Sequence, residues 1–177
     1  ISDRMLKIMR RNITRQQTID LIQRFREEVP GIHLRTTMMV GHPGETEEDY
    51  LELLDFVEKT RFERLGAFPY SHEEDTHNYK YYVDDVPAEV KQDRMNRLME
   101  LQEGIALSLN EMKVGKSLKV IIDREDSEYF VGRTEFDSPE VDGEVLIGKT
   151  KRLKTGRFYD VKIEEAMPFD LLGTVLM

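Results

Sequence analysis

Residues 35–49, RTTMMVGHPGETEED, decide the fold of the first two thirds of this chain. The run at 33–40 is nearly continuous in β-branched and long apolar residues, which is typical of a parallel strand buried on both faces. The turn at 41–44, GHPG, ends the strand, because its glycines allow backbone conformations that a Cβ forbids and its proline lacks a donor. Thr46 then predicts a helix N-cap, to which Asp49 can reach back. Such a strand, turn and helix bind ligands in many α/β proteins, and they also suit an ordinary βα connection.

Composition sets the limits of the possible functions. The chain has 177 residues, which suffices for one large domain or two small ones. It contains no cysteine, so disulfides, thiol nucleophiles and cysteine-ligated clusters within the chain are excluded. Its formal charge of −9 argues against a broad nucleic-acid surface and favours a basic partner. No apolar run approaches the ~20 residues that cross a bilayer, and we expect a cytoplasmic protein.

The first part of the chain alternates helices and strands. Ser2 predicts the cap of a short helix, and Thr14 with Gln17 forms a capping box for a second helix. The segment 64–70, RLGAFPY, predicts a second strand, so the pattern indicates parallel βα units. Two strands cannot close a barrel, and the chain opens on an isoleucine. We therefore expect the back part of a larger domain.

The polar stretch 71–86, SHEEDTHNYKYYVDDV, predicts a long loop. Its two histidines, His72 and His77, together with neighbouring acids raise the possibility of a metal site. Their spacing of five residues differs from the four that places two histidines on one helical face. We therefore interpret the stretch as a solvated loop and assign no metal ligands in this chain.

Pro87 predicts the start of a long helix, after which the pattern changes period near Val114. Five short segments that follow have the properties of strands and are separated by turn signals, which is typical of a small OB-like barrel. They lie at 118–122, 129–133, 144–149, 158–163 and 171–176. The predicted fold class is therefore α/β plus all-β, with one domain at 1–107, linker helix included, and a five-stranded barrel at 108–177.

Four stretches resemble the second half of the radical-SAM methylthiotransferase family, and the barrel resembles the TRAM domain that follows in those enzymes. They are ISDRMLKIMRRNITR at 1–15, RTTMMVGHPGETEEDY at 35–50, RFERLGAFPYSHEEDT at 61–76 and PAEVKQDRMNRLMELQ at 87–102. The resemblance covers nearly the whole chain. In this family the turn is usually Gly-Phe-Pro-Gly-Glu-Thr, whereas His42 stands here where phenylalanine is common.

The resemblance implies a reaction and its cofactors. One branch of the family methylthiolates an adenosine in transfer RNA, and the other an aspartate of a small-subunit ribosomal protein. The stretches at 34–37, 62–76 and 137–145 look like the second branch, which we favour. The family uses S-adenosyl-L-methionine and two 4Fe-4S clusters, whose CxxxCxxC cysteines would lie upstream, so this chain alone would be inactive. The alternatives are the transfer-RNA branch and a non-catalytic binding module.

The resemblance also implies binding residues, although no catalytic residue in this chain. Gly41 would let S-adenosylmethionine approach the backbone, and Phe68 to Tyr70 would flank its adenine. Arg35 could lie on the inner strand face as a cation or in a salt bridge. The full set of implied cofactor-binding residues is Arg35, Thr37, Gly41, Pro43, Gly44, Phe68 and Tyr70.

The barrel carries two opposed charge clusters. Four carboxylates crowd into one connection, and we expect them to attract the lysines and arginines of a ribosomal protein while repelling phosphate. These predicted substrate-binding residues are Asp137, Glu140, Asp142 and Glu144. The opposing cluster could instead bind RNA. It consists of Lys149, Lys151, Arg152, Lys154 and Arg157.

Overall fold

The computed structural model describes residues 1–176, and Met177, the last residue of the predicted barrel domain, lies outside the described residues. The chain divides into two compact units, 1–102 and 103–177. The division falls inside one helix, α5 (Ala88–Glu111), a few residues before the predicted boundary at 107/108. That boundary stays a prediction, and each unit is described by itself.

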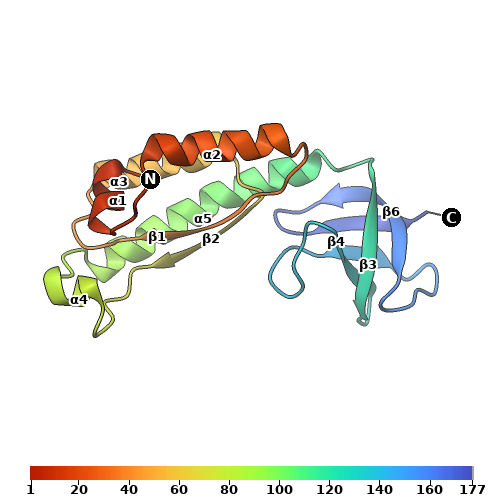
Figure 1. The fold of residues 1–177 in the computed structure, drawn as a ribbon. Helices are drawn as coiled ribbons and strands as arrows, with labels where there is room; N and C mark the ends of the chain where they lie inside the picture. Colours follow the sequence, from red (N-terminus) through yellow and green to blue (C-terminus); the bar gives the residue numbers. More distant parts are fainter. Residues whose placement is uncertain (177) are drawn as a thin grey trace. The chain divides into compact units, whose positions relative to one another are not determined.

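A two-stranded parallel sheet organises the first unit. Strand β1 (Arg35–Val40) pairs with β2 (Arg64–Pro69) from Arg35↔Arg64 to Val40↔Pro69, which confirms the predicted parallel arrangement. Figure 1 shows the two strands side by side with the long helices alongside. The prediction that the first strand is buried on both faces is wrong for this chain. Val40 is buried, but Arg35 and Thr37 are exposed, because the helices cover only one face of the sheet.

Helices of the first unit begin where the sequence predicts caps. Their bounds are α1 (Asp3–Ile8), α2 (Arg15–Glu28), α3 (Glu47–Thr60), α4 (His77–Tyr81) and α5. Ser2 caps α1, and complete capping boxes at Thr14 and Thr46 begin α2 and α3. Helix α4 corrects the prediction of a loop throughout 71–86. It begins because the Thr76 side chain accepts a hydrogen bond from the Tyr79 amide.

The core of the first unit lies between the sheet, α3 and α5. Val40, Tyr50 and Leu98 are fully buried there. The Tyr50 hydroxyl donates to the Arg94 carbonyl oxygen at 2.9 Å, and Gln102 donates to the Phe62 carbonyl oxygen at 3.0 Å. These two bonds join α5 to α3 and to the connection that follows α3, so α5 is fixed to the unit by polar as well as apolar contacts.

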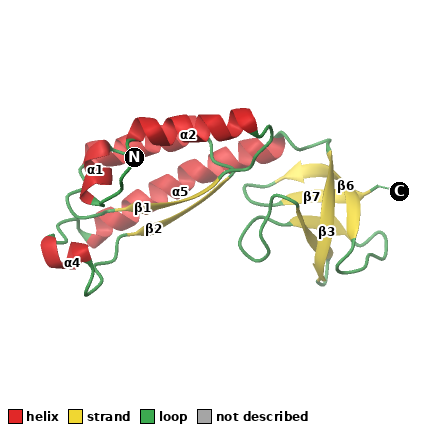
Figure 2. Ribbon diagram, viewed as in Figure 1, coloured by secondary structure: helices red, strands yellow, loops and turns green. Residues whose placement is uncertain are grey.

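The second unit holds a closed five-stranded barrel, as predicted (Figure 2). Its strands are β3 (Ser117–Glu125), β4 (Tyr129–Thr134), β5 (Val145–Gly148), β6 (Phe158–Ala166) and β7 (Leu171–Val175). They close in the order β3-β4-β5-β7-β6, with β5 and β7 parallel. Among the described residues of this unit, 103–176, a core of nine buried apolar residues, including Ile122, Ile147 and Ile163, fills the barrel.

Within residues 1–176, no helix combines the length and the apolarity needed to cross a bilayer. The same residues contain no group of three or more histidine, aspartate or glutamate side chains arranged to hold a metal ion.

Candidate functional site

The turn after β1 is shaped by a lysine of α5. Gly41 has φ +73°, and a Cβ built on it would lie 2.3 Å from the Lys91 Cγ. Lys91 is buried, and its ammonium group bonds Asp84 at 2.6 Å. The space that the missing side chain leaves is therefore filled by Lys91. Contact of a cofactor with Gly41 stays a prediction, and the structure gives a second reason for glycine at this position.

A buried ion pair fastens the same turn. The Glu45 carboxylate accepts hydrogen bonds from the Gly41 amide and from Arg94, both at 2.8 Å. The Glu45 and Arg94 side chains are only 7% and 6% exposed. Burial raises the pKa of Glu45 even though the bonds from Gly41 and Arg94 favour its charged form. The Glu45 carboxylate thus holds the backbone of the turn, and Arg94 of α5 favours its charged form.

His42 completes the turn as a buried, neutral side chain. It is 1% exposed; Nδ1 lies 2.9 Å from the Pro43 carbonyl oxygen, and Nε2 lies 2.8 Å from Nδ2 of Asn78. A carbonyl oxygen only accepts and an amide nitrogen only donates, so Nδ1 carries the proton. Burial lowers the pKa of His42. Its ring packs 5.2 Å from that of Tyr70.

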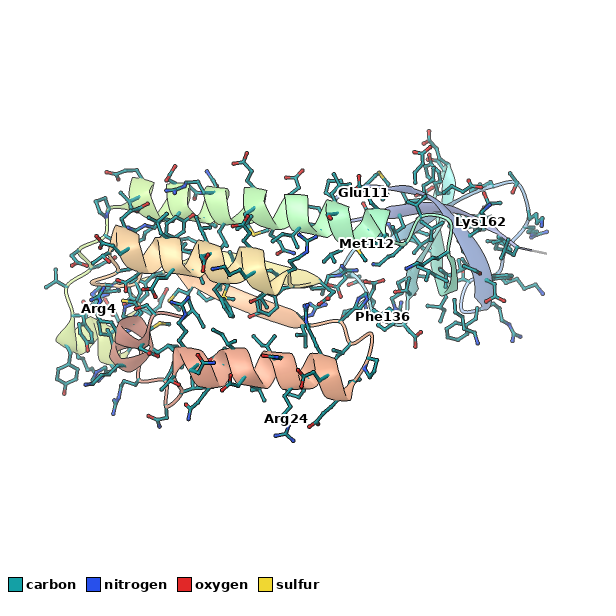
Figure 3. The ribbon with its side chains drawn as sticks, turned by 90° about the horizontal axis from the view of Figure 1, so that it is seen from above. Arg4, Arg24, Glu111, Met112, Phe136 and Lys162 are labelled. Atoms are coloured by element: carbon teal, nitrogen blue, oxygen red, sulfur yellow. The ribbon has the colours of Figure 1, made fainter. Side chains whose placement is uncertain are left out.

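The far side of the turn is tied to α1 and to the stretch before α5. The Gly44 amide donates to Asp85 at 2.7 Å. Arg4, labelled in Figure 3, donates to the Gly44 carbonyl oxygen at 2.6 Å. Arg4 and Ser2 also donate to Asp49, the third residue of α3. Although burial raises the pKa of Asp49, hydrogen bonds from Arg4, Ser2 and Thr46 hold it well below its usual range.

The exposed face of the sheet unites some of the predicted cofactor-binding residues. The register places Arg35 and Thr37 on one face of β1, and Phe68 lies on the matching face of β2 with 45% exposure. Thr37 and Phe68 line a cavity of about 340 Å³ together with Met39, Glu45 and residues of α1. Arg35 lines a neighbouring cavity of about 310 Å³ beside α2 and has interaction partners of its own.

Other predicted residues lie inside the packed turn instead. Gly41, Pro43 and Tyr70 are buried, and Gly44 is half-buried. The Tyr70 hydroxyl lies 2.9 Å from Nδ1 of His72, and burial raises the pKa of this tyrosine. The structure therefore separates the set: Thr37 and Phe68 line an open cavity, whereas the turn residues and Tyr70 do not line it.

Three of the four carboxylates of the barrel have hydrogen-bond partners within the second unit. Asp137 accepts from the Thr134 hydroxyl at 2.5 Å, and Asp142 accepts from the Ser138 amide at 2.7 Å. Glu144 binds Arg124 through both oxygens, at 2.5 and 2.8 Å. Glu140 is exposed and has φ +63°. A role of these side chains in substrate binding stays a prediction. Asp137 and Asp142 also hold the backbone of the connection, and Glu144 joins it to β3.

The basic cluster is more open. All five of its residues are exposed, and Lys149 also pairs with Glu125 at 2.8 Å, unlike the four others in its cluster, for which no ion pair is found within residues 1–176. They are Lys151, Arg152, Lys154 and Arg157.

Several contacts that hold the turn were missed by sequence reasoning. The buried positions of His42, Lys91 and Arg94 depend on partners far away in the chain. One signal was available, because a histidine stands where a phenylalanine is common. A ring that keeps the aromatic shape but adds two polar nitrogens requires hydrogen-bond partners when it is buried, and Asn78 is one of them.

Comparison with known proteins finds a similar family for part of each unit. A model of the Radical SAM superfamily matches residues 1–57, and a TRAM domain model matches residues 114–176. Residues 1–57 are therefore similar to the Radical SAM superfamily, and residues 114–176 are similar to TRAM domains.

The particular relatives are proteins named ribosomal protein uS12 methylthiotransferase RimO. The chain is 60% identical over 176 residues to the one from Parabacteroides distasonis, 56% identical to the one from Bacteroides thetaiotaomicron and 57% identical to one from Porphyromonas gingivalis. In each case the match covers 99% of this chain and 41% of the relative. The chain thus spans about two fifths of the length of these relatives. The predicted resemblance to radical-SAM methylthiotransferases of this branch is confirmed.

Proposed function

We propose that this chain works in a RimO-type radical-SAM methylthiotransferase, which adds a methylthio group to the β-carbon of an aspartate in ribosomal protein uS12. The identity of 60% over 99% of the chain to a protein of that name carries the proposal. A ribosomal-protein substrate also favours action in the cytoplasm. The transfer-RNA branch is the alternative, and the exposed basic cluster of the barrel is the observation that favours it.

We propose that S-adenosylmethionine binds on the exposed face of the sheet, over Thr37 and Phe68. The cavity there offers an aromatic ring and a hydroxyl. Gly66, between Leu65 and Ala67 on β2, adds open space on the same strand, because an added Cβ would meet nothing within 4 Å. These groups suit an adenosine, which stacks on aromatic rings and accepts hydrogen bonds. When bound, the cofactor supplies the hydrogen-abstracting radical and the methyl group.

The residues of this chain do not fit an iron–sulfur cluster. Such clusters are held by cysteine thiolates, and the sequence contains none. We therefore propose that the cluster ligands of the working enzyme come from outside this chain, and no step of the chemistry is assigned to residues 1–177.

A chimeric enzyme tests the proposed function. The aligned 41% of the Parabacteroides distasonis protein would be replaced by this chain, and the modification of uS12 would be measured by mass spectrometry in cells that lack the native enzyme. We expect methylthiolated uS12 from the chimera, because the remaining part supplies the cluster ligands. A folded, cluster-containing chimera that leaves uS12 unmodified would contradict the proposal.

Charge reversal decides between the two partners of the barrel. Changing Asp137, Glu140, Asp142 and Glu144 to lysine should weaken binding of uS12, and changing Lys149, Lys151, Arg152 and Lys154 to glutamate should spare it. Because exposed ion pairs are individually worth only ~0.2–1 kcal/mol, the association rate and its salt dependence are the better readouts. If only the second set matters and transfer RNA binds, the transfer-RNA alternative holds.

A further inference from the structure

The stretch after β2 presents apolar side chains to solvent at the edge where both strands end. Val83 is 80% exposed, Tyr81 71% and Tyr79 44%, although each is large enough to serve in a core. We call residues 71–85 the aromatic rim. In parallel βα units the carboxyl ends of the strands are where ligands bind. The rim lies directly after that edge, because β2 ends at Pro69.

The aromatic rim is held in place by polar contacts with the turn and α5. Asn78 bonds His42, Asp85 bonds the Gly44 amide, and Asp84 bonds Lys91. Rings stack within the rim as well: His72 lies 4.9 Å from Tyr79, and His77 lies 4.5 Å from Tyr81. The exposed rings are therefore ordered before any partner arrives, which lowers the entropic cost of binding.

Charges around these rings favour one kind of partner. Glu73, Glu74 and Asp75 are exposed on the rim, and Lys80 pairs with Asp75 at 3.6 Å. Arg10, which follows α1 in the chain, lies 3.4 Å from Nδ1 of His77. The rim thus contains five acids, with Asp84 and Asp85 included, and a single lysine, beside aromatic faces that attract cations. A lysine or arginine side chain can satisfy both features at once, whereas a phosphate would meet repulsion.

We propose that the aromatic rim docks a Lys- or Arg-bearing segment of the protein substrate. The proposal rests on the proposed function and deepens it. It adds a second protein-binding surface, next to the edge where β1 and β2 end, to the one proposed on the barrel. Tyrosines of the rim supply contact area with little loss of side-chain freedom, and Glu74 and Asp75 select the positive charge. Docking there would bring the segment beside the turn 41–44.

Peptide binding to the complete 177-residue chain tests the proposal. Fluorescence anisotropy would compare a labelled peptide of alternating arginine and glycine with one of alternating glutamate and glycine. Two variants, Tyr81→Ser and Glu74→Lys, should each weaken the arginine peptide about threefold to tenfold. Two matched controls on α3, Leu51→Ser and Glu58→Lys, change exposed residues of the same kinds and should leave the affinity unchanged.

Each outcome decides. Loss confined to the rim variants, with circular dichroism unchanged, supports the proposal, and the two chemically different variants guard against a folding defect in either one. Equal affinities in rim variants and controls, no binding of the arginine peptide, or a rim effect on an RNA oligonucleotide instead would overturn it. The chimera assay on uS12 tests the proposed function separately. If the chimera modifies uS12 although the rim variants bind the peptide normally, the proposed function stands and the rim proposal fails.

Discussion

The two units cover their sheets in opposite ways. The barrel closes on itself and hides nine apolar residues in its centre, whereas the sheet of the first unit leaves one face exposed, with Phe68 at 45%. The first unit instead buries charged and polar groups around its turn: His42, Lys91 and Arg94 are all under 9% exposed. The barrel therefore depends mainly on apolar burial, and the turn on directional polar contacts.

The largest expected effect breaks the polar arrangement of the first unit. Arg94→Leu should destabilise it by about 3–5 kcal/mol, because the Glu45 carboxylate stays buried without its partner. Urea unfolding followed by amide exchange of β1 measures the loss. Arg24→Leu removes an ion pair whose side chains are 69% and 59% exposed, so it should cost less than about 0.5 kcal/mol. Similar losses in both variants would contradict the comparison.

A smaller effect tests the packing of the turn against α5. Gly41→Ala should cost about 2–3 kcal/mol, because the added Cβ overlaps Lys91 in a left-handed backbone conformation. Gly44→Ala is the matched control. It has φ +77° in the same turn, but the nearest atom to its Cβ would lie 4.0 Å away. The difference between the two unfolding free energies isolates the overlap, and equal costs would show that Lys91 yields easily.

Local signals in the sequence predicted much of this fold, and long-range contacts account for what they missed. Capping boxes at Thr14 and Thr46 and the alternation in the barrel depend on a few neighbouring residues, so the sequence predicted α2, α3 and the barrel strands but not α4. The same apolar run, however, suits a strand covered on one face or on both, so the exposed face of β1 was not foreseen.

The candidate site was predicted less completely. Thr37 and Phe68 could be placed on one face from the two-residue period alone. That Lys91 fills the space beside Gly41 depends on a residue 50 positions away, and no local pattern carries that information. The sequence shows how many acids the barrel connection contains. It does not predict that they bond to Thr134, Ser138 and Arg124.

A moderate effect sharpens the description of the barrel. Ile163→Val removes one methyl group from a fully buried side chain and should cost about 0.5–1.5 kcal/mol. Ile121→Val is the control, because Ile121 is half-buried on β3 and should cost less. Thermal unfolding of both variants measures the difference. If the two costs are equal, apolar burial inside the barrel is not what distinguishes this unit.

The smallest expected effect is a pH dependence that the first unit should show and the barrel should not. Burial lowers the pKa of His42 below its ordinary value of 6.5, although bonds with Pro43 and Asn78 and the charges of Asp84 and Asp85 act against it. The unfolded chain therefore binds a proton more readily than the folded one. The stability that the neutral His42 contributes is fully present above the ordinary pKa. It is lost as the pH falls from there through the lowered pKa of the folded state. One proton contributes at most about 1.4 kcal/mol per pH unit.

Urea unfolding between about pH 7.5 and about pH 5.5, with amide exchange of β1 and β6 followed separately, measures this dependence. His42→Gln should flatten the pH slope of the β1 amides and leave that of β6 unchanged, while His77→Gln controls for the loss of a histidine elsewhere in the unit. The raised pKa of Glu45 acts in the opposite direction, because the folded state then binds the proton more readily, and its effect begins at the ordinary carboxyl value of 4.5 and extends upward from it. An unchanged slope in His42→Gln would show that the buried imidazole does not set the acid sensitivity of the turn. The polar stabilisation of the turn would then be attributed to the pair of Glu45 and Arg94 alone.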